Sequence, residues 1–512
     1  MKRITVSQTL HNLRKDFERL WAPVVLSLVL LGAWAHMDRL RSDMTPGLAE
    51  GWMNLLLPLV WAFLAALAVQ EEGLSDDREF WITRPFRRLP LAAEKGLFLL
   101  LAIHVPLFVA HCAILVGRGF HVADAMPQLL WKQLLIACCV TLPAAALAAA
   151  VANIPQFLLG LMLAAVTVAV MSGVLDTLRW PLMPPDEVRN EFAVAPIVAG
   201  AAMMVAIQYA RRRTRLSRGI GAGAVVAAVL IFALVPREVT AVVGYGNPGI
   251  TVRQRPGPPD PPERRRQYGP LPNGVVVGIP LEISGLPARS DIGFEQLSFE
   301  MTTSDGERFR ASPMMPFMSR ENAMVRATFG GEQVLWIHNS VWTRLRTARV
   351  NIKGHVLATI RRHGEETWLP VEGTGGVKGI GRCYSLFYEE RIDQSGLKVV
   401  CESANRAPIR TAIRIWDPVS GRDWRSGFRS GYTFLANVYP KTTWLSPLWR
   451  EQAYFQVRSE ESRSAGDRWW ITREALGRAK IEVTPVFDAG GADLHYELRD
   501  IRLSEYVLQP PH

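Results

Sequence analysis

The chain has 512 residues, 49% of them hydrophobic, and it carries a formal net charge of +11. It is long enough for several domains, but its long apolar runs are concentrated before residue 236. The basic residues gather in a few loops between those runs, so membrane topology explains the charge. Nucleic-acid binding is therefore not needed to explain the positive charge, and we expect no nucleic-acid partner.

Residues 1–19 are predicted to form an amphipathic helix that lies on the inner membrane surface. Leu10, Leu13 and Phe17 recur at helical spacing, with charged residues between them. The alternative is a cytoplasmic extension of the first membrane span. The pattern by itself leaves both possibilities open.

Residues 20–236 are predicted to form an α-helical polytopic membrane bundle of about seven transmembrane helices. Each apolar run is about as long as a helix needs to cross the hydrocarbon core, roughly 17 to 25 residues. The boundary between the fourth and fifth runs is marked only by a short break before Pro155. The predicted spans cover residues 20–36, 52–70, 97–116, 129–151, 155–175, 192–209 and 219–235.

Lysine and arginine residues predict the orientation of this bundle, because positively charged loops are retained in the cytoplasm. Five basic residues precede the first span, five follow the second and five follow the sixth, whereas the other loops carry at most two each. With an odd number of spans, the N-terminus is cytoplasmic and everything after residue 236 lies outside. We therefore expect a protein of the bacterial inner (plasma) membrane with a periplasmic or extracellular C-terminal domain.

Small and ionisable residues within the spans predict two further features. Small residues allow close helix packing, and the candidates are residues 144–150 and the Gly219/Gly223 pair. His104 and His111 share one face of the third span, and Lys132 lies near the outer start of the fourth. Ionisable groups in a membrane are costly and suggest a pathway, a relay or a partner. The alternative is that they reach the interface or bond a backbone carbonyl.

The C-terminal half is predicted to be an all-β region. Residues 247–273 are rich in proline and charge, which favours an extended linker. Beyond them, short runs of alternating apolar and polar residues are typical of antiparallel β-sandwiches. A glycine-rich stretch at 373–381 is a plausible joint between two of them. We expect a first sandwich over residues 274–372 and a second over 380–512.

Cys383 and Cys401 both lie in strand-like runs of this external region. An oxidising compartment permits a disulfide between them, which we favour over two buried thiols on neighbouring strands.

Patterns of covalent catalysis are missing from the sequence. It contains no P-loop, no HExxH or GxSxG motif, and no cysteine and histidine cluster at zinc spacing. We therefore predict no catalytic residues, no metal site, no cofactor and no enzymatic activity.

The loop after the second span is more elaborate than orientation alone demands, because it combines aromatic, proline and arginine residues. Its aromatic side chains can enter the membrane interface while its arginines contact lipid phosphates. At these residues, and at the amphipathic N-terminal helix, the sequence resembles the membrane (permease) subunit of type-2 ABC exporters, over residues 1–236 at most. The resemblance rests on the loop residues Glu72, Gly73, Phe80, Trp81, Arg84, Pro85, Arg88 and Lys95.

The resemblance implies that this loop docks on a separate cytoplasmic ABC ATPase, with Phe80, Trp81, Arg84, Arg87 and Arg88 in contact with it. It also implies a homodimer or a heterodimer. The expected function is a permease-like subunit of an ATP-driven export or extraction system, coupled to the external β domain. The alternative is a membrane-anchored sensor or envelope assembly protein whose β-sandwiches bind a ligand or a protein.

Overall fold

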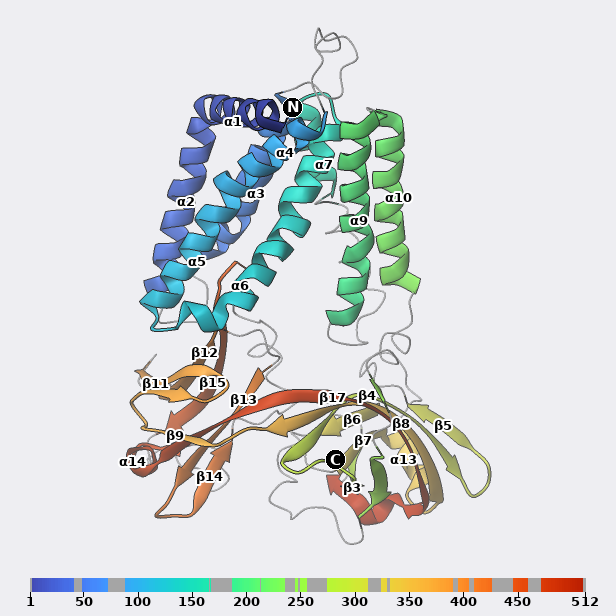
Figure 1. The fold of residues 1–512 in the computed structure, drawn as a ribbon. Coiled ribbons are helices and arrows are strands. Elements are labelled where there is room, and N and C mark those ends of the chain that lie inside the picture. The colour runs from blue at the N-terminus through green and yellow to red at the C-terminus, as the bar shows by residue number, and fades with distance from the viewer. Residues whose placement is uncertain are drawn as a thin grey trace.

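The computed structural model describes most of the chain in segments. These are residues 2–40, 48–71, 88–164, 166, 187–211, 213–234, 245–246, 249–255, 274–311, 324–328, 332–389, 395–404, 409–425, 445–458 and 471–509. They form an N-terminal helix bundle and a C-terminal region that is mostly β-sheet (Figure 1). The predicted fold class is therefore confirmed.

Six described helices are long and apolar enough to cross a membrane. Two of these continuous helices consist of α-helical parts joined by a π turn. The bounds are α1 (Lys2–Arg19), α2 (Trp21–Leu40), α3 (Leu48–Gln70), α4 (Arg88–Leu99) with η2 (Leu100–His104) and α5 (Val105–Gly117), α6 (Val122–Ile136) with η3 (Ala137–Thr141) and α7 (Leu142–Ala150), α9 (Glu187–Arg211) and α10 (Thr214–Leu234).

Six of the seven predicted spans correspond to these six helices. The remaining one, residues 155–175, begins in the shorter apolar helix Ile154–Ala164, and most of its second half lies outside the described residues. The carbonyl of Ala150 accepts a hydrogen bond of 2.9 Å from Arg218, near the start of α10. Since α9 is about 37 Å long, its first residue lies at the other end of the bundle from Ala150.

Helix α1 lies across one end of the bundle and does not continue the axis of α2 (Figure 1). Its buried side chains include Leu13 and Asp16, whereas Leu10, Arg14 and Glu18 are exposed. This arrangement agrees with the amphipathic helix and not with an extension of the first span.

Close packing of α9 on α10 uses glycines other than the predicted pair. A Cβ built on Gly200 would lie 2.4 Å from the side chain of Ala224, and one on Gly221 would lie 2.8 Å from Met204. Gly219 and Gly223 have open space at the same position. The alanines of 144–150 do pack inside the bundle, where Ala146 and Ala150 contact Ala201 and Met204.

Three sheets form the β region. The first is an eight-stranded sheet that curves as a half-barrel (Figure 1), with the order β14 (Arg422–Arg425), β13 (Ile409–Asp417), β17 (Lys480–Arg502), β8 (Arg349–His363), β4 (Ser290–Thr303) and β5 (Arg308–Ala311). Strands β1 (Tyr245–Gly246) and β9 (Thr367–Leu369) also pair with β17.

The two other sheets pack on opposite ends of this curved sheet. One has the order β10 (Gly373–Val377), β11 (Gly381–Glu389), β12 (Ser395–Ser403), β15 (Trp449–Arg458) and β16 (Ile471–Thr472). The other has the order β18 (Val507–Gln509), β3 (Gly274–Ser284), β7 (Glu332–His338) and β6 (Met324–Thr328), with β2 (Thr251–Gln254) beside β3. Two short helices, α13 (Asn339–Leu345) and α14 (Arg473–Arg478), pack against strands of these sheets.

Strand β17 contributes side chains to two hydrophobic cores of the β region. Its first half pairs with β13 and buries Ile481 and Val483 in one core, while its second half pairs with β8 and buries Leu494 and Tyr496 in the other. A strand of 23 residues is long enough to belong to both. The last residues of the chain therefore pack with the strands that follow residue 250, and not only with their sequence neighbours.

Residues 251–254, inside the predicted linker, form β2 and pair with β3. Val252 is buried there, because alternation places its side chain on the core side. The whole β region lies at the end of the bundle opposite to α1 (Figure 1).

Candidate functional site: a buried ionic junction between the helix bundle and the β region

Four charged side chains meet where the bundle contacts the β region, and we call Asp38, Arg118, Glu402 and Arg450 the ionic junction. Arg450 Nη1 lies 2.9 Å from Asp38 Oδ1, and Arg450 Nε lies 2.9 Å from Glu402 Oε1. Arg118 Nη1 lies 3.7 Å from the same Glu402 oxygen. Asp38, Glu402 and Arg450 are all almost completely buried.

The helices and strands that carry these four residues explain why their side chains meet. Asp38 lies in the last turn of α2, and Arg118 directly follows α5. Glu402 and Arg450 are directly opposite each other on the antiparallel strands β12 and β15, so their side chains share one face of the sheet. The carbonyl of Asp38 accepts hydrogen bonds from both Arg450, at 3.2 Å, and Arg118, at 3.0 Å. Two helix ends are thus bonded to one pair of strands.

The electrostatics of the junction favour the charged form of Arg450. Burial alone lowers the pKa of Arg450, but the negative charges of Asp38 and Glu402 outweigh burial, and the pKa is raised. A buried guanidinium that donates to two carboxylates has the geometry that compensates part of its desolvation. Arg450 therefore depends on both partners to be tolerated in this position.

The segment that precedes β15 enters the bundle beside this junction. Leu445 and Leu448 are buried among residues of the membrane helices, such as Leu129. Nε2 of His111 donates a hydrogen bond of 2.9 Å to the carbonyl of Leu445, and Lys132 donates to the carbonyl of Ser446. His111 lies about 9 Å from the end of α5 and Lys132 about 15 Å from the start of α6, so the β region reaches well inside the helices.

Ser446 connects this segment to the junction, because its hydroxyl donates to Asp38 Oδ2 at 3.1 Å. The structure thus brings two of the predicted intramembrane polar residues, His111 and Lys132, together on one segment of the β region. Each bonds a backbone carbonyl.

The third of these residues, His104, belongs to a different contact. Its Nδ1 lies 3.1 Å from Gln133 Oε1, and its Nε2 lies 3.3 Å from Thr141 Oγ1. His104 ends the π turn η2 and Thr141 ends the π turn η3. Each π turn lies just ahead of a proline, Pro106 or Pro143, whose missing N–H disturbs the helical hydrogen bonds. The contact therefore joins two points at which neighbouring helices depart from regular geometry.

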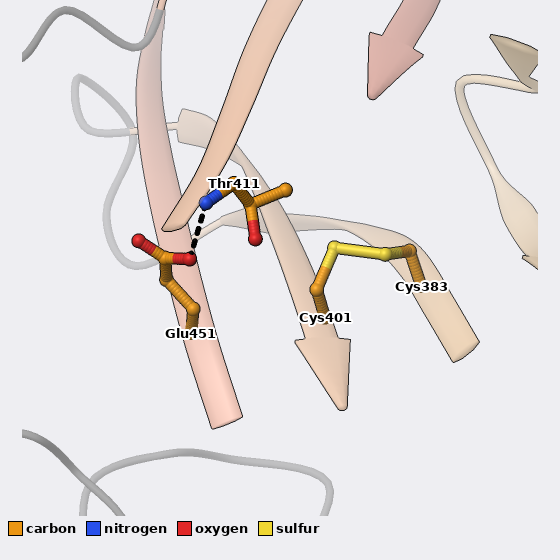
Figure 2. The surroundings of a disulfide bond; sticks show 4 residues. All are labelled: Cys383, Cys401, Thr411 and Glu451. Carbon is orange, nitrogen blue, oxygen red and sulfur yellow. Dashed lines mark hydrogen bonds between the residues drawn. A yellow bond between two sulfur atoms is a disulfide. The ribbon is translucent and has the colours of Figure 1, made fainter. Parts of the chain in front are cut away.

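The predicted disulfide between Cys383 and Cys401 is present (Figure 2). The two cysteines are directly opposite each other on β11 and β12, and Cys401 immediately precedes Glu402. On the far side of β12, Glu451 of β15 accepts a hydrogen bond of 2.6 Å from the backbone N–H of Thr411 on β13. The strand that carries Glu402 is thus covalently tied on one side, and its other neighbour is bonded to the opposing sheet.

A second buried ion pair lies at the other end of the bundle. Lys95 of α4 lies 2.8 Å from Asp16 of α1, and both side chains are almost fully buried. Nδ2 of Asn12 donates to Glu94 at 3.1 Å, and Arg19 pairs with Glu71 at the end of α3. These bonds hold α1 against the helices on both sides of residues 72–87.

Most of the predicted ATPase-binding loop lies outside the described residues, namely Glu72, Gly73, Phe80, Trp81, Arg84, Pro85 and Arg87. Arg88 begins α4, and Lys95 is the buried partner of Asp16. Reasoning from the sequence did not identify Asp38, Glu402 or Arg450. The only available signal was the acidic Asp38 near the end of an apolar span, and Arg450, which pairs with it, is 412 residues away in the chain.

The junction offers connection and not covalent chemistry, because its charged groups are paired with one another. No protein-family model, curated protein or solved structure matches this chain.

Proposed function

We propose that this chain is the permease-like membrane subunit of an ATP-driven export or extraction system. A separate cytoplasmic ABC ATPase acts on the α1 end of the bundle, and the β region works on the periplasmic or extracellular side of a bacterial inner membrane. The subunit functions as a homodimer or a heterodimer. The observation that carries the proposal is the ionic junction, which connects the helix ends to the β region.

The junction supports transmission of movement. Removing one partner from a buried ion pair costs about 3 to 5 kcal/mol, so α2 and the β12/β15 pair do not separate easily. A displacement of α2 or α5 is therefore passed to the strands that carry Glu402 and Arg450. A β domain that was merely anchored would need no buried charges at this contact.

A single continuous helix connects the two ends of the proposed transmission path. It runs through α4, η2 and α5 over residues 88–117, a length of about 45 Å. Its first residue, Arg88, belongs to the predicted ATPase-binding loop, and Lys95 near its start is paired with Asp16 of α1. Near its far end, His111 bonds Leu445, and Arg118 follows it into the junction. The π turn η2 is the point at which this helix can bend.

The test separates binding of the ATPase from coupling to it. The chain is purified from its native membrane in mild detergent, and a co-purifying P-loop ATPase is identified and assayed. We expect the double variant Trp81→Ala/Arg84→Ala to lose the ATPase. We expect Arg450→Met to retain it but to lose transport-linked stimulation of ATP hydrolysis in reconstituted membranes. Arg308→Met, at an exposed ion pair, is the matched control.

An ATPase that is absent, or that binds the double variant as well as the wild type, contradicts the proposal. That outcome favours the membrane-anchored sensor or assembly protein, whose helices serve as an anchor.

A further inference from the structure

We propose that His355, Asp493 and His495 form a binding site for a divalent transition-metal ion of the zinc class. The site lies on the face of the eight-stranded sheet that points away from the hydrophobic core. It is independent of the export proposal, because it involves neither the ionic junction nor the loop after the second span.

Strand register places the three residues together. His355 of β8 and His495 of β17 are directly opposite each other in antiparallel pairing. Asp493 is two residues before His495, so both side chains leave β17 on the same face. The alternate residues Leu494 and Tyr496 point to the other face and are buried in the core. Strand β8 lies between β17 and β4, and its antiparallel pairing with β17 fixes the three Cα positions relative to one another.

The distances fit a shared ion. One Asp493 oxygen lies 2.7 Å from Nε2 of His355 and 3.6 Å from Nε2 of His495. The candidate ligand atoms all lie within 4.8 Å of one another. Atoms that bind one zinc ion tetrahedrally, each at about 2 Å, are about 3.3 Å apart. Small side-chain rotations therefore bring all three to bonding distance.

The side chains select the class of ion. Two imidazoles and one carboxylate suit zinc and its neighbours, whereas calcium and magnesium prefer sets of oxygen ligands. The two imidazole rings are stacked, with centroids 4.4 Å apart and planes 4° from parallel, and Nε2 of each ring lies within 3.6 Å of the same Asp493 oxygen. A simple histidine–aspartate hydrogen bond accounts for His355 and Asp493 but gives no role to the stacked His495.

An ion held by these residues crosslinks β8 and β17. Strand β17 belongs to both hydrophobic cores. Metal binding would therefore stabilise the strand that joins the two halves of the β region, through contacts that exist only in the folded state.

The test uses the full-length, untagged chain in detergent after treatment with a chelator. Zinc affinity is measured by competition with a chromophoric chelator, and cobalt is added separately to record the visible absorption of a nitrogen-ligated ion. We expect zinc to bind at this site, and we expect His495→Gln and Asp493→Asn each to weaken binding at least about tenfold. His495 is 73% exposed, so its replacement should leave the fold intact, which the thermal midpoint without metal checks.

His363→Gln is the matched control, because His363 lies 3.3 Å from Asp291 in the same sheet, and no third candidate ligand accompanies this pair in the part of the chain that the structure describes. It should bind zinc as the wild type does. The proposal fails if the wild type binds no zinc, or if His495→Gln and Asp493→Asn bind it unchanged. It also fails if His363→Gln loses as much affinity, or if magnesium or calcium displaces zinc at equal concentration.

Discussion

Arg450 is the residue on which the contact between the bundle and the β region most depends. The variant Arg450→Met retains the side-chain volume but leaves Asp38 and Glu402 buried without their main cation. We expect a loss of about 3 to 5 kcal/mol in the free energy of unfolding, because uncompensated buried charge is strongly destabilising. Thermal and denaturant unfolding in detergent measures the loss.

A combined variant tests whether the charges themselves are the cause. Asp38→Asn/Glu402→Gln/Arg450→Met removes the three almost completely buried charges at once and leaves Arg118, whose side chain is 14% exposed, and replacing buried ionic partners together is far less costly than removing one of them. The combined variant should therefore be more stable than Arg450→Met alone. Equal or lower stability would mean that side-chain shape, and not charge, holds the contact together.

From the surroundings of Asp417 we predict that the stability of the folded protein depends on pH. The hydroxyl of Ser420 donates to its carboxylate at 2.7 Å, and this bond lowers the pKa against the opposing effect of burial. The N–H of Val419 and the charge of Arg478 lower the pKa further. A lowered folded-state pKa contributes stability above the unfolded-state value, about 4, and that contribution is lost as the pH falls through the folded-state pKa.

The comparison for Asp417 is with Asp417→Asn. The wild type should unfold at a higher temperature than the variant near pH 7, and the two midpoints should converge below about pH 4. A difference that stays constant over the whole range would show that hydrogen-bond geometry alone is responsible.

Among the elements, β12 is tied to its neighbours in several ways. The Cys383–Cys401 disulfide closes a loop with a sequence separation of 18, which corresponds to about 3 kcal/mol in the chain-entropy description. We expect Cys383→Ser/Cys401→Ser to lower the stability by about that amount, because the unfolded chain regains the freedom that the bond removes. Unfolding with and without a reductant measures the loss.

The control for the disulfide is the response to reductant. The double serine variant should not respond to it, whereas the wild type should be weakened to the level of the variant. Free thiols in the non-reduced wild type at Cys383 and Cys401, detected by alkylation and mass spectrometry, would show that the bond does not form.

At the scale of the whole molecule, the two ends of the helix bundle contact different parts of the chain. Helix α1 lies across one end and the β region lies at the other (Figure 1). The distribution of basic residues predicts that the α1 end is cytoplasmic. We expect a reporter fused after residue 512 to be active only outside the cytoplasm, and a reporter fused before residue 1 to be active only inside it.

The predicted orientation agrees with the disulfide, because such bonds persist in an oxidising compartment outside the cytoplasm. A C-terminal reporter that is active only in the cytoplasm would contradict the orientation, and with it the periplasmic role of the β region.

Local patterns in the sequence were sufficient for the classes of structure. Long apolar runs predict membrane helices because each backbone group is satisfied within its own helix, and alternation predicts strands for a similarly local reason. The cysteine pair could also be predicted from the sequence, since both residues lie in short strand-like runs close together in the chain. The glycine pair at 219 and 223 shows the limit, because a spacing does not say which face of a helix meets its neighbour.

The sequence by itself determined that this protein has a membrane bundle and a β region, because these properties depend on neighbouring residues, and the orientation that it predicts stays a prediction. Only the tertiary structure decided that Asp38 meets Glu402 and Arg450, that His355 meets Asp493 and His495, and that β17 belongs to two cores. The physical reason is that charges and ligands pair across distances set by strand register and helix packing, which no local spacing records.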